Sequence, residues 1–250
     1  MDDVIKCFQP DLFKDRHVLV TGGTSGIGLG IARGFARLGA RVIATGSSEK
    51  KLAALKAGLS DGSLSFQRLD VRNVEEIRRV IGDFGRLDVL VTAAGIARPH
   101  DEFTDPVYDE VMEVNLNSVM RLAMAARSLL AKSHGSILSI ASMLSYLADP
   151  NVPAYCASKT GLVGLVRSLS HAFGPEGIRV NAIAPGYHKT DMTRVHWENP
   201  PVAAKISERS ALKRWGTVDD LVGAALFLSS PAARFITGAT LPVDGGYGIG

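Results

Sequence analysis

The sequence predicts an α/β fold in which helices cover both faces of a doubly wound parallel sheet. Two patterns indicate this fold. Short runs rich in Val, Ile and Leu alternate with longer stretches of helical periodicity, and the short runs lack the polar alternation of a half-exposed strand. Such strands are buried on both faces, as in a parallel sheet sandwiched between helices. With 250 residues, 46% of them hydrophobic, the chain is long enough to bury a full core.

The first half of the chain contains four predicted strands. "HVLV" and "RVIAT" are β-branched runs, and a helical pattern begins between them near Ile27. A second helix begins near Ser48, where serine can cap it, and leads to "LSFQRLD". A third helix begins near Val74 and leads to the apolar run "LDVLVTAA". We therefore expect strands at residues 17–20, 41–45, 64–70 and 87–94.

The second half continues the alternation of strands and helices. Helical patterns begin near Tyr108, Pro153 and Thr217. The runs "GSILSIAS", "IRVNAIAP" and "TLPVD" accompany them and again carry apolar residues without polar alternation. We therefore expect three further strands, at residues 135–142, 178–185 and 240–244.

The chain shows no linker, repeat or change of composition, so we expect a single domain over residues 1–250. The one long segment without a clear strand runs from Gly186 to Trp215 and follows the carboxyl end of the sixth strand. Ligands of such sheets bind outside the carboxyl ends of the strands. We therefore expect a substrate lid at about 186–215.

Composition argues against several classes of partner. The formal charge is +3 and there is no basic run interleaved with aromatic residues, so we expect no nucleic-acid partner. No apolar run approaches the roughly 20 residues of a membrane span, and the N-terminal sequence lacks the regions of a signal peptide, which favours the cytoplasm. Cys7 and Cys156 make no disulfide framework, and the six histidines fall in no ligand spacing, so we expect no metal site.

The first predicted strand runs directly into "TGGTSGIG" at residues 21–28. Gly22, Gly26 and Gly28 let the backbone turn tightly and approach a pyrophosphate, whose charge meets the amides and the positive dipole end of the next helix. Because the pattern lies between a strand and a helix, it indicates a dinucleotide site and not merely a tight turn.

Tyr155 and Lys159 in "YCASK" are four residues apart, which places them on one face of a helix. Hydride transfer between a nicotinamide and a carbonyl leaves an alkoxide that must gain a proton, so a general acid is needed. A free tyrosine has a pKa near 10, and we expect the lysine ammonium and an oxidised nicotinamide ring to lower that pKa. The pair therefore predicts a tyrosine that exchanges the proton with lysine assistance.

Eight motifs in order make the chain resemble the short-chain dehydrogenase/reductase family, of its classical type, from His17 to about Gly246. They are "TGGTSGIG", the aspartate of "RLDV", "TAAG", "VNLNS", "SIAS", "YCASK", "RVNAIAPG" and "VDGG". The resemblance implies a Rossmann-like fold, an NAD(P)-dependent oxidoreductase and a homotetramer. Thr92 departs from the family, which usually has asparagine there, so we expect a local change in strand hydrogen bonding without loss of activity.

The resemblance also implies a role for individual residues. The catalytic set would be Asn115, Ser142, Tyr155 and Lys159, in which Ser142 hydrogen-bonds the substrate oxygen and Asn115 fixes a water between Lys159 and solvent. Taken alone, Ser142 could merely cap a loop, and Asn115 could bond only to backbone. Asp70 and Val71 would hold the adenine, Ala94 and Gly95 would lie beside its ribose, and Pro185, Gly186 and Thr190 would meet the nicotinamide end. The full set of expected cofactor positions is Gly22, Thr24, Ser25, Gly26, Ile27, Gly28, Gly46, Ser47, Asp70, Val71, Ala94, Gly95, Tyr155, Lys159, Pro185, Gly186 and Thr190.

The end of the second strand bears on the choice of cofactor. An NAD-selective site generally presents an acidic side chain there, which accepts from the ribose hydroxyls. Here that place is Gly46, and no acid follows it directly. A 2′-phosphate could instead be met by helix amides near Ser48 and by the side chains of Thr45, Ser47, Ser48, Lys50 and Lys51, although the serines would cap the helix with either cofactor. We expect NADP(H) to be accepted and mildly preferred over NAD(H).

The expected lid suits a polar or anionic small molecule, because it contains Tyr187, His188, Lys189, Arg194, His196 and Trp197. Apolar side chains flank Ser142, namely Met143, Leu144, Tyr146 and Leu147. We favour a small secondary alcohol, sugar-like or a hydroxy acid. One alternative is a 3-oxoacyl thioester reductase, which Ser133 and Glu176 weaken, since such relatives tend to have basic residues there. The other is a non-catalytic dinucleotide-binding regulator on the same fold, which would not need the Tyr155 and Lys159 pair.

Two predicted helical segments, 119–130 and 161–173, carry apolar or small residues around more of their surface than one core contact needs. Gly161 and Gly164 would permit close approach of a second helix. Thicker packing within one chain is the alternative. We expect a homo-oligomer, a tetramer as the resemblance implies.

Overall fold

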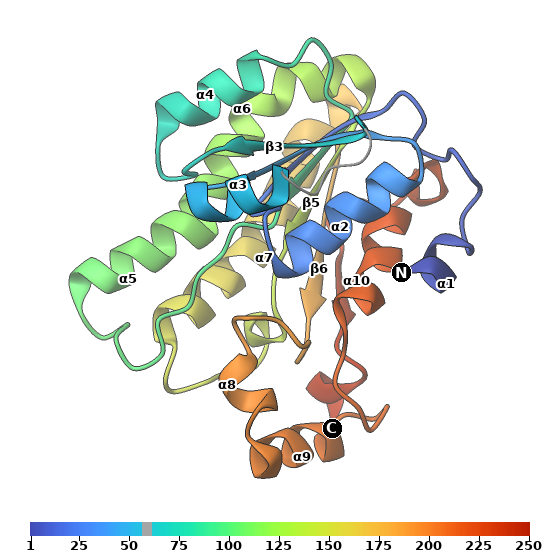
Figure 1. Cartoon of the computed structure of the whole chain (residues 1–250). Helices are drawn as coiled ribbons and strands as arrows, with labels where there is room; N and C mark the ends of the chain where they lie inside the picture. Colours follow the sequence, from blue (N-terminus) through green and yellow to red (C-terminus); the bar gives the residue numbers. More distant parts are fainter. Residues whose placement is uncertain (57–61) are drawn as a thin grey trace.

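The sheet has seven parallel strands, as the sequence predicts. The structure, a computed structural model, describes residues 1–56 and 62–250. The strand order β3-β2-β1-β4-β5-β6-β7 shows that the chain starts near the middle, builds one edge and then the other (Figure 1). The order reverses between β1 and β4, which is where sheets of this kind bind their ligands. The strands are β1 (His17–Thr21), β2 (Arg41–Gly46), β3 (Leu64–Arg68), β4 (Val89–Thr92), β5 (Ser136–Ile140), β6 (Arg179–Pro185) and β7 (Thr240–Val243).

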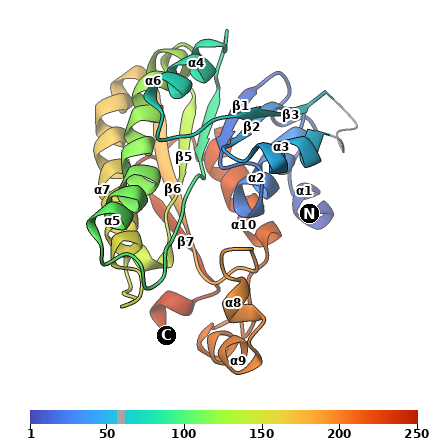
Figure 2. The ribbon, with the colours of Figure 1, turned by 60° about the vertical axis from the view of Figure 1, so that its left-hand side comes forward.

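Helices cover both faces of the sheet (Figure 2). On one face lie α1 (Asp2–Ile5), α2 (Gly26–Arg37), α3 (Glu49–Lys56) and α10 (Val218–Ser229). On the other lie α4 (Val74–Gly82), α5 (Asp105–Met112), α6 (Ser118–Ser133) and α7 (Pro153–Phe173). Alternate residues of β1 enter the two layers, because Val18 and Val20 belong to the first core and Leu19 to the second. The doubly wound fold is confirmed.

The helix that carries Asn115 changes its hydrogen bonding in the middle. Residues Glu113–Asn117 form a π-helical segment that joins α5 to α6. Such wide turns appear mostly as single turns within α-helices, frequently at functional sites. The sequence pattern predicted one helix from near Tyr108, whereas the structure begins it at Asp105 and inserts this turn.

Residues 186–215 form a largely helical segment outside the sheet, here called the excursion, and backbone hydrogen bonds join its two ends. The Lys189 amide donates to Gly216 O at 3.0 Å, and the Gly216 amide donates to Tyr187 O at 2.9 Å. Between these bonds lie α8 (Arg194–Trp197) and α9 (Pro200–Arg209), close to the C-terminus (Figure 1). The sequence pattern predicted neither helix; α8 is a single turn of four residues and α9 has ten.

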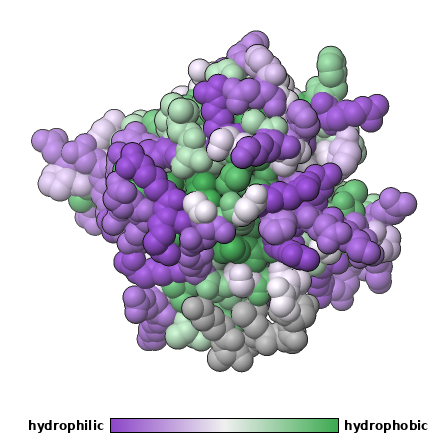
Figure 3. All heavy atoms as spheres, turned by 90° about the horizontal axis from the view of Figure 1, so that it is seen from above, coloured by the Kyte–Doolittle hydropathy of each residue, from purple (hydrophilic) through white to green (hydrophobic). Residues whose placement is uncertain are grey.

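The surface seen from above is mostly hydrophilic. Hydrophilic side chains lie on both sides of a narrow apolar strip (Figure 3). Among the helices that the structure describes, none has the length and apolar character to cross a lipid bilayer.

Candidate active site

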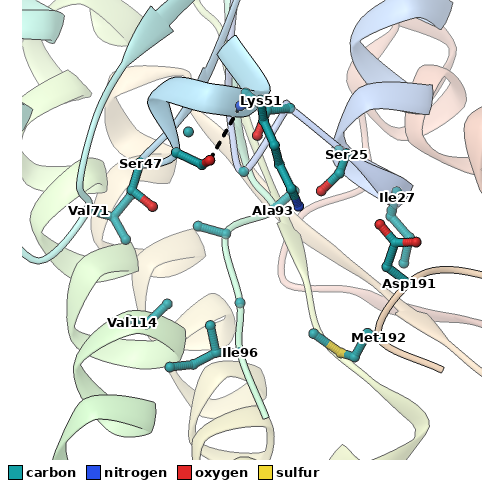
Figure 4. Close-up of a pocket in the computed structure, with 18 of the residues that line it drawn as sticks. Ser25, Ile27, Ser47, Lys51, Val71, Ala93, Ile96, Val114, Asp191 and Met192 are labelled. Carbon is teal, nitrogen blue, oxygen red and sulfur yellow. Dashed lines mark hydrogen bonds between the residues drawn. The ribbon is translucent and has the colours of Figure 1, made fainter. Parts of the chain in front are cut away.

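A cavity of about 410 Å³ lies at the carboxyl ends of β1, β2, β3 and β4 (Figure 4). This volume is within the range of small-molecule sites. Four of the expected cofactor positions, Tyr155, Lys159, Pro185 and Gly186, do not line it. The others do, namely Gly22, Thr24, Ser25, Gly26, Ile27, Gly28, Gly46, Ser47, Asp70, Val71, Ala94, Gly95 and Thr190.

The glycine loop has the shape that a pyrophosphate needs. Gly22 has φ +66°, and a Cβ there would lie 2.5 Å from Ala94 N; a Cβ on Gly28 would lie 2.4 Å from Gly22 O. Larger residues would therefore clash with backbone. Ser25 is the N-cap of α2, yet its side chain caps none of the first amides of the helix. Those amides are available to an anion in the cavity.

The end of β2 presents hydroxyls and one amine to the cavity. Ser47, Ser48 and Lys51 line it, and the Lys51 side chain extends across the opening (Figure 4). No described carboxylate forms an ion pair with Lys51. Thr45 is fully buried and Lys50 does not line the cavity, so of the candidates for a 2′-phosphate the cavity is lined by Ser47, Ser48 and Lys51.

Gly46 is constrained by the glycine loop. A Cβ on Gly46 would lie 2.4 Å from Thr24 Oγ1 and 2.7 Å from Thr24 Cγ2. A carboxylate of the kind found in NAD-selective sites therefore cannot be placed at position 46 without displacing Thr24, which itself lines the cavity.

Asp70 lies at the expected place, but its carboxylate already has a partner. Arg72 binds it through Nη2 at 2.8 Å and Nε at 3.0 Å, and this hydrogen bonding holds the pKa of Asp70 below its usual value. Arg72 also pairs with Glu110 at 3.2 Å, and Arg98 lies 3.5 Å from the same carboxylate. An ion-pair chain that the sequence pattern did not reveal thus borders the cavity.

Tyr155 and Ser142 come together from different elements. Tyr155 lies in the first turn of α7, and Ser142 follows β5. Burial raises the pKa of the Tyr155 hydroxyl, and the nearby Ser142 side chain acts in the opposite direction. The net direction is upward, and Lys159 is not among the groups that shift this pKa. That Lys159 and an oxidised nicotinamide ring lower it stays a prediction for the protein with its cofactor.

Lys159 is buried and points to the end of β5. Its Nζ donates to Ile140 O at 2.7 Å, and burial lowers its pKa to about 8. A Cβ on Gly95 would lie 3.5 Å from both Lys159 Nζ and Asn115 Oδ1, so these two polar atoms converge beside the cavity wall. The two side chains are therefore close enough for the predicted water of Asn115 to reach Lys159.

Asn115 also holds the backbone of the loop after β4. Its amide nitrogen donates to Ile96 O at 2.9 Å, and its Oδ1 accepts from the Ile96 amide at 2.8 Å. The same amide nitrogen donates to Ser158 Oγ at 3.1 Å. Asn115 thus bonds to backbone, as the structural alternative to a catalytic role predicted. These contacts fix the loop that lines the cavity.

Ser142 caps a short helical turn as well as facing Tyr155. Its Oγ accepts from the Leu144 amide at 3.1 Å, and its own amide donates to Ser145 Oγ at 3.3 Å. Ser145 Oγ donates to Lys159 O at 2.8 Å, which ties this turn to α7. Sequence reasoning missed Ser145, because a serine in "SMLS" gives no signal of a contact fourteen residues away.

The expected change at Thr92 is a hydrogen bond between strands. Thr92 is buried, and its hydroxyl donates to Ser139 Oγ at 2.9 Å across β4 and β5. The strand ends therefore stay joined without the asparagine that is usual in the family.

The last group of expected positions lies between β6 and the excursion. The Gly186 amide donates to Val243 O at 3.1 Å, so Pro185 and Gly186 join β6 to β7. Thr190 lines the cavity together with Asp191 and Met192 (Figure 4). A Cβ on Gly26 would lie 3.8 Å from Thr190 Cγ2, so the excursion reaches the glycine loop.

Aromatic rings from the excursion and from the C-terminal segment gather around Tyr187. Its ring lies 5.2 Å from Tyr247, 5.4 Å from Trp215 and 6.0 Å from His196, between centroids. The Arg209 guanidinium lies 4.3 Å from the centre of the Tyr247 ring. Burial raises the pKa of Tyr187. Tyr247 and Arg209 were not expected, because the sequence patterns do not bring α9 and the C-terminal segment together.

Comparison with known proteins agrees with this geometry. The sequence model described as enoyl-(acyl carrier protein) reductase matches residues 22–248. The gluconate 5-dehydrogenase of Gluconobacter oxydans is 36% identical over an alignment that covers 96% of this chain and 98% of that protein. The 3-oxoacyl-(acyl-carrier-protein) reductase of Rickettsia typhi is 38% identical, over 94% of this chain and 97% of that protein.

Solved structures are similar over the same length. A gluconate 5-dehydrogenase from Burkholderia cenocepacia, in complex with NADP and tartrate, has a TM-score of 0.87 and 35% identity, covering 96% of this chain and 98% of that chain. The match of sequence and of fold along nearly the whole chain shows that the protein belongs to the short-chain dehydrogenase/reductase family of oxidoreductases.

Proposed function

We propose that the protein transfers a hydride between NADP(H) or NAD(H) and a small secondary alcohol or its ketone, with a sugar-like hydroxy acid as the favoured substrate class. The observation that carries this proposal is the meeting of Tyr155, Ser142 and Lys159 beside a cavity that suits a dinucleotide. Relatives whose names include gluconate 5-dehydrogenase support the substrate class.

The catalytic roles follow from the positions of the side chains. The nicotinamide, when bound, supplies or accepts the hydride. Ser142 holds the substrate oxygen beside the Tyr155 hydroxyl, and Tyr155 gives that oxygen a proton in reduction or takes one in oxidation. Lys159, with a pKa of about 8, can accept or release a proton near neutral pH and faces Asn115 across Gly95. Asn115 keeps the loop after β4 in place for this exchange.

The cofactor residues would be those that line the cavity. The glycine loop and the first amides of α2 would hold the pyrophosphate. Ser47, Ser48 and Lys51 favour NADP(H), because they offer two hydroxyls and one cation to a 2′-phosphate and Gly46 stands where an NAD-selective site presents an acid. The excursion at 186–215 would act as the lid, since Thr190 already reaches the glycine loop.

The preference for an acid rests on Arg209. Its guanidinium stacks on Tyr247 and pairs with no carboxylate among the described residues. Asp149 and Arg209 both influence the ionisation of Tyr187, so charged groups of both signs lie near that hydroxyl. Arg209 would bind the carboxylate of the substrate, and the aromatic rings would cover its carbon chain.

A thioester reductase remains the second candidate, because a relative of that name covers the same length. Such relatives tend to have basic residues before the fifth strand and after the tyrosine helix, whereas here Glu176 follows α7 and pairs with Arg127 of α6. Ser133 donates to Leu87 O at 2.6 Å and adds no charge. These contacts weigh against it.

For assembly we propose a homotetramer in the cytoplasm. Met120 and Met124 on α6 are 40% and 47% exposed, and a Cβ on Gly164 would meet nothing within 4 Å. Gly161 serves packing within the chain instead, because a Cβ there would lie 3.0 Å from Leu116 Cδ2. Both cysteines are free thiols, which suits a reducing compartment.

The test is a panel of sugar acids, neutral polyols and 3-oxoacyl thioesters, each with NADP(H) and NAD(H), followed through nicotinamide absorbance. The proposal predicts turnover that is highest with a sugar acid. Turnover that is highest with a thioester would favour the second candidate, and no turnover on any compound would refute both.

A further inference from the structure

Glu102 is a buried carboxylate in the loop between β4 and α5. Glu102 is 1% exposed. Its Oε2 accepts from the Tyr155 amide at 2.8 Å, and its Oε1 accepts from the Arg98 amide at 2.8 Å. Both carboxylate oxygens are thus bound by backbone N–H groups, which is an arrangement that makes burial of a carboxylate tolerable.

The amino end of α7 has no cap of its own. Its N-cap residue is Val152, which has no polar side chain, and Pro153 follows as the first helical residue. The Tyr155 amide is among the first-turn donors that have no partner within a helix. Glu102 therefore caps α7 from a distant part of the chain, and a negative charge there suits the helix dipole.

The same loop lines the cofactor cavity. Ile96 and Arg98 both border the cavity, and the His100 amide donates to Asn151 O at 2.9 Å, just before α7. The Arg98 guanidinium turns to Glu110 and does not pair with Glu102. Glu102 is thus the side chain that connects the cavity wall directly to the backbone of Tyr155.

We propose that Glu102 is a positioning residue, which fixes the Tyr155 side chain relative to the cofactor cavity by clamping the first turn of α7 to the loop after β4. This inference rests on the proposed function for its effect on turnover. Its structural part, the link between Glu102 and Tyr155, can be measured without turnover.

The charge of Glu102 provides that measurement. The groups that influence the Tyr155 hydroxyl are Ser142, Cys156 and Glu102, and the Lys159 ammonium lies over its ring. Besides burial, the negative charge of Glu102 raises the pKa of Tyr155. Removing that charge should therefore move the titration of Tyr155 to lower pH. Because burial is the larger influence, loosening of the turn would lower this pKa as well, and a variant that keeps the charge is needed to separate the two effects.

The experiment compares Glu102→Gln with Asp101→Asn. Both variants remove one charge from the same loop, but Asp101 is exposed. Tyr155 is titrated by ultraviolet difference absorbance, as the difference between each protein and the same protein with Tyr155→Phe. For Glu102→Gln we expect a lower titration midpoint and a turnover number about tenfold lower, with the cofactor KM changed less than about twofold. Asp101→Asn should match the unmodified protein.

A second variant separates position from charge. Glu102→Asp keeps the charge but is one methylene shorter, so it cannot reach both amides; we expect reduced turnover with the Tyr155 midpoint still high. This variant also serves if Glu102→Gln does not fold. Full turnover in Glu102→Asp, or a Glu102→Gln that behaves as Asp101→Asn does, would overturn the inference. If Glu102→Gln shifts the Tyr155 midpoint but the unmodified protein transfers no hydride on the panel, the link between Glu102 and Tyr155 stands and the proposed function is refuted.

Discussion

Lys159 Nζ lies 5.6 Å from the centre of the Tyr155 ring and donates at 2.7 Å to Ile140 O. The helix brings the two side chains to one face, and the carbonyl at the end of β5 holds the ammonium in place. Because Lys159 is buried, its pKa falls to about 8. The lysine therefore titrates in the range where the proposed proton exchange occurs.

The shifted pKa of Lys159 predicts a pH dependence of stability. The folded-state pKa of about 8 lies below the ordinary 10.5, so between these values the unfolded chain binds more protons than the folded one. The free energy of unfolding should therefore rise with pH across this range, by at most about 3 kcal/mol. Urea unfolding of the unmodified protein and of Lys159→Met, from pH 7 to about 10, isolates this group. An identical pH dependence in both proteins would contradict the burial effect.

Lys51 should discriminate between the two cofactors. A charge-assisted hydrogen bond contributes about 1.5 to 3 kcal/mol, so Lys51→Ala should raise the Kd of NADP(H) roughly tenfold or more and leave that of NAD(H) unchanged. Lys50→Ala is the matched control, because Lys50 precedes it on α3 and does not line the cavity. Equal weakening of both cofactors by Lys51→Ala would show that Lys51 contacts a shared part of the molecule.

Arg209 should select for acids among the substrates. Arg209→Gln removes the cation beside Tyr247, so kcat/KM for a sugar acid should fall about tenfold while that for the corresponding neutral polyol changes little. Lys205→Gln, an equivalent charge change on the exposed side of α9, is the control. If acid and polyol lose the same factor, Arg209 acts on lid structure and not on the carboxylate.

The proposed oligomer can be weighed by light scattering. At micromolar concentration we expect a particle about four times the 26.6 kDa mass of the chain. Gly164→Arg should reduce that mass, because position 164 faces open space on a helix with few charged residues. A stable 26.6 kDa particle of the unmodified protein would refute the oligomer.

The fold could be predicted because its signals are local. Most strands are apolar runs, β3 with its alternating LSFQR being an exception, and each strand lies within one or a few residues of its predicted place. The glycine loop follows the first strand. The predicted strand 87–94 shortens to Val89–Thr92, since the residues after Thr92 leave the sheet to line the cavity. Periodicity alone cannot show where a buried apolar run stops pairing.

The motif residues of the site could be predicted from the sequence, but the residues that hold them in place could not. Glu102, Ser145 and Arg209 gain their importance from contacts with distant segments, and a single sequence does not show which distant side chains meet. Gly46 illustrates the same limit. The sequence shows that no acid stands at this position, but only the structure shows that Thr24 lies too close for any side chain there.

The role of Tyr155 is the central claim, and Tyr155→Phe tests it most directly. The variant keeps the ring and the Glu102 contact to the backbone amide, and it removes the hydroxyl that exchanges the proton. Turnover with the best substrate of the panel should fall at least about a hundredfold, while the Kd of NADP(H), measured by fluorescence titration, should stay within about twofold. Near-normal turnover in Tyr155→Phe would contradict the account.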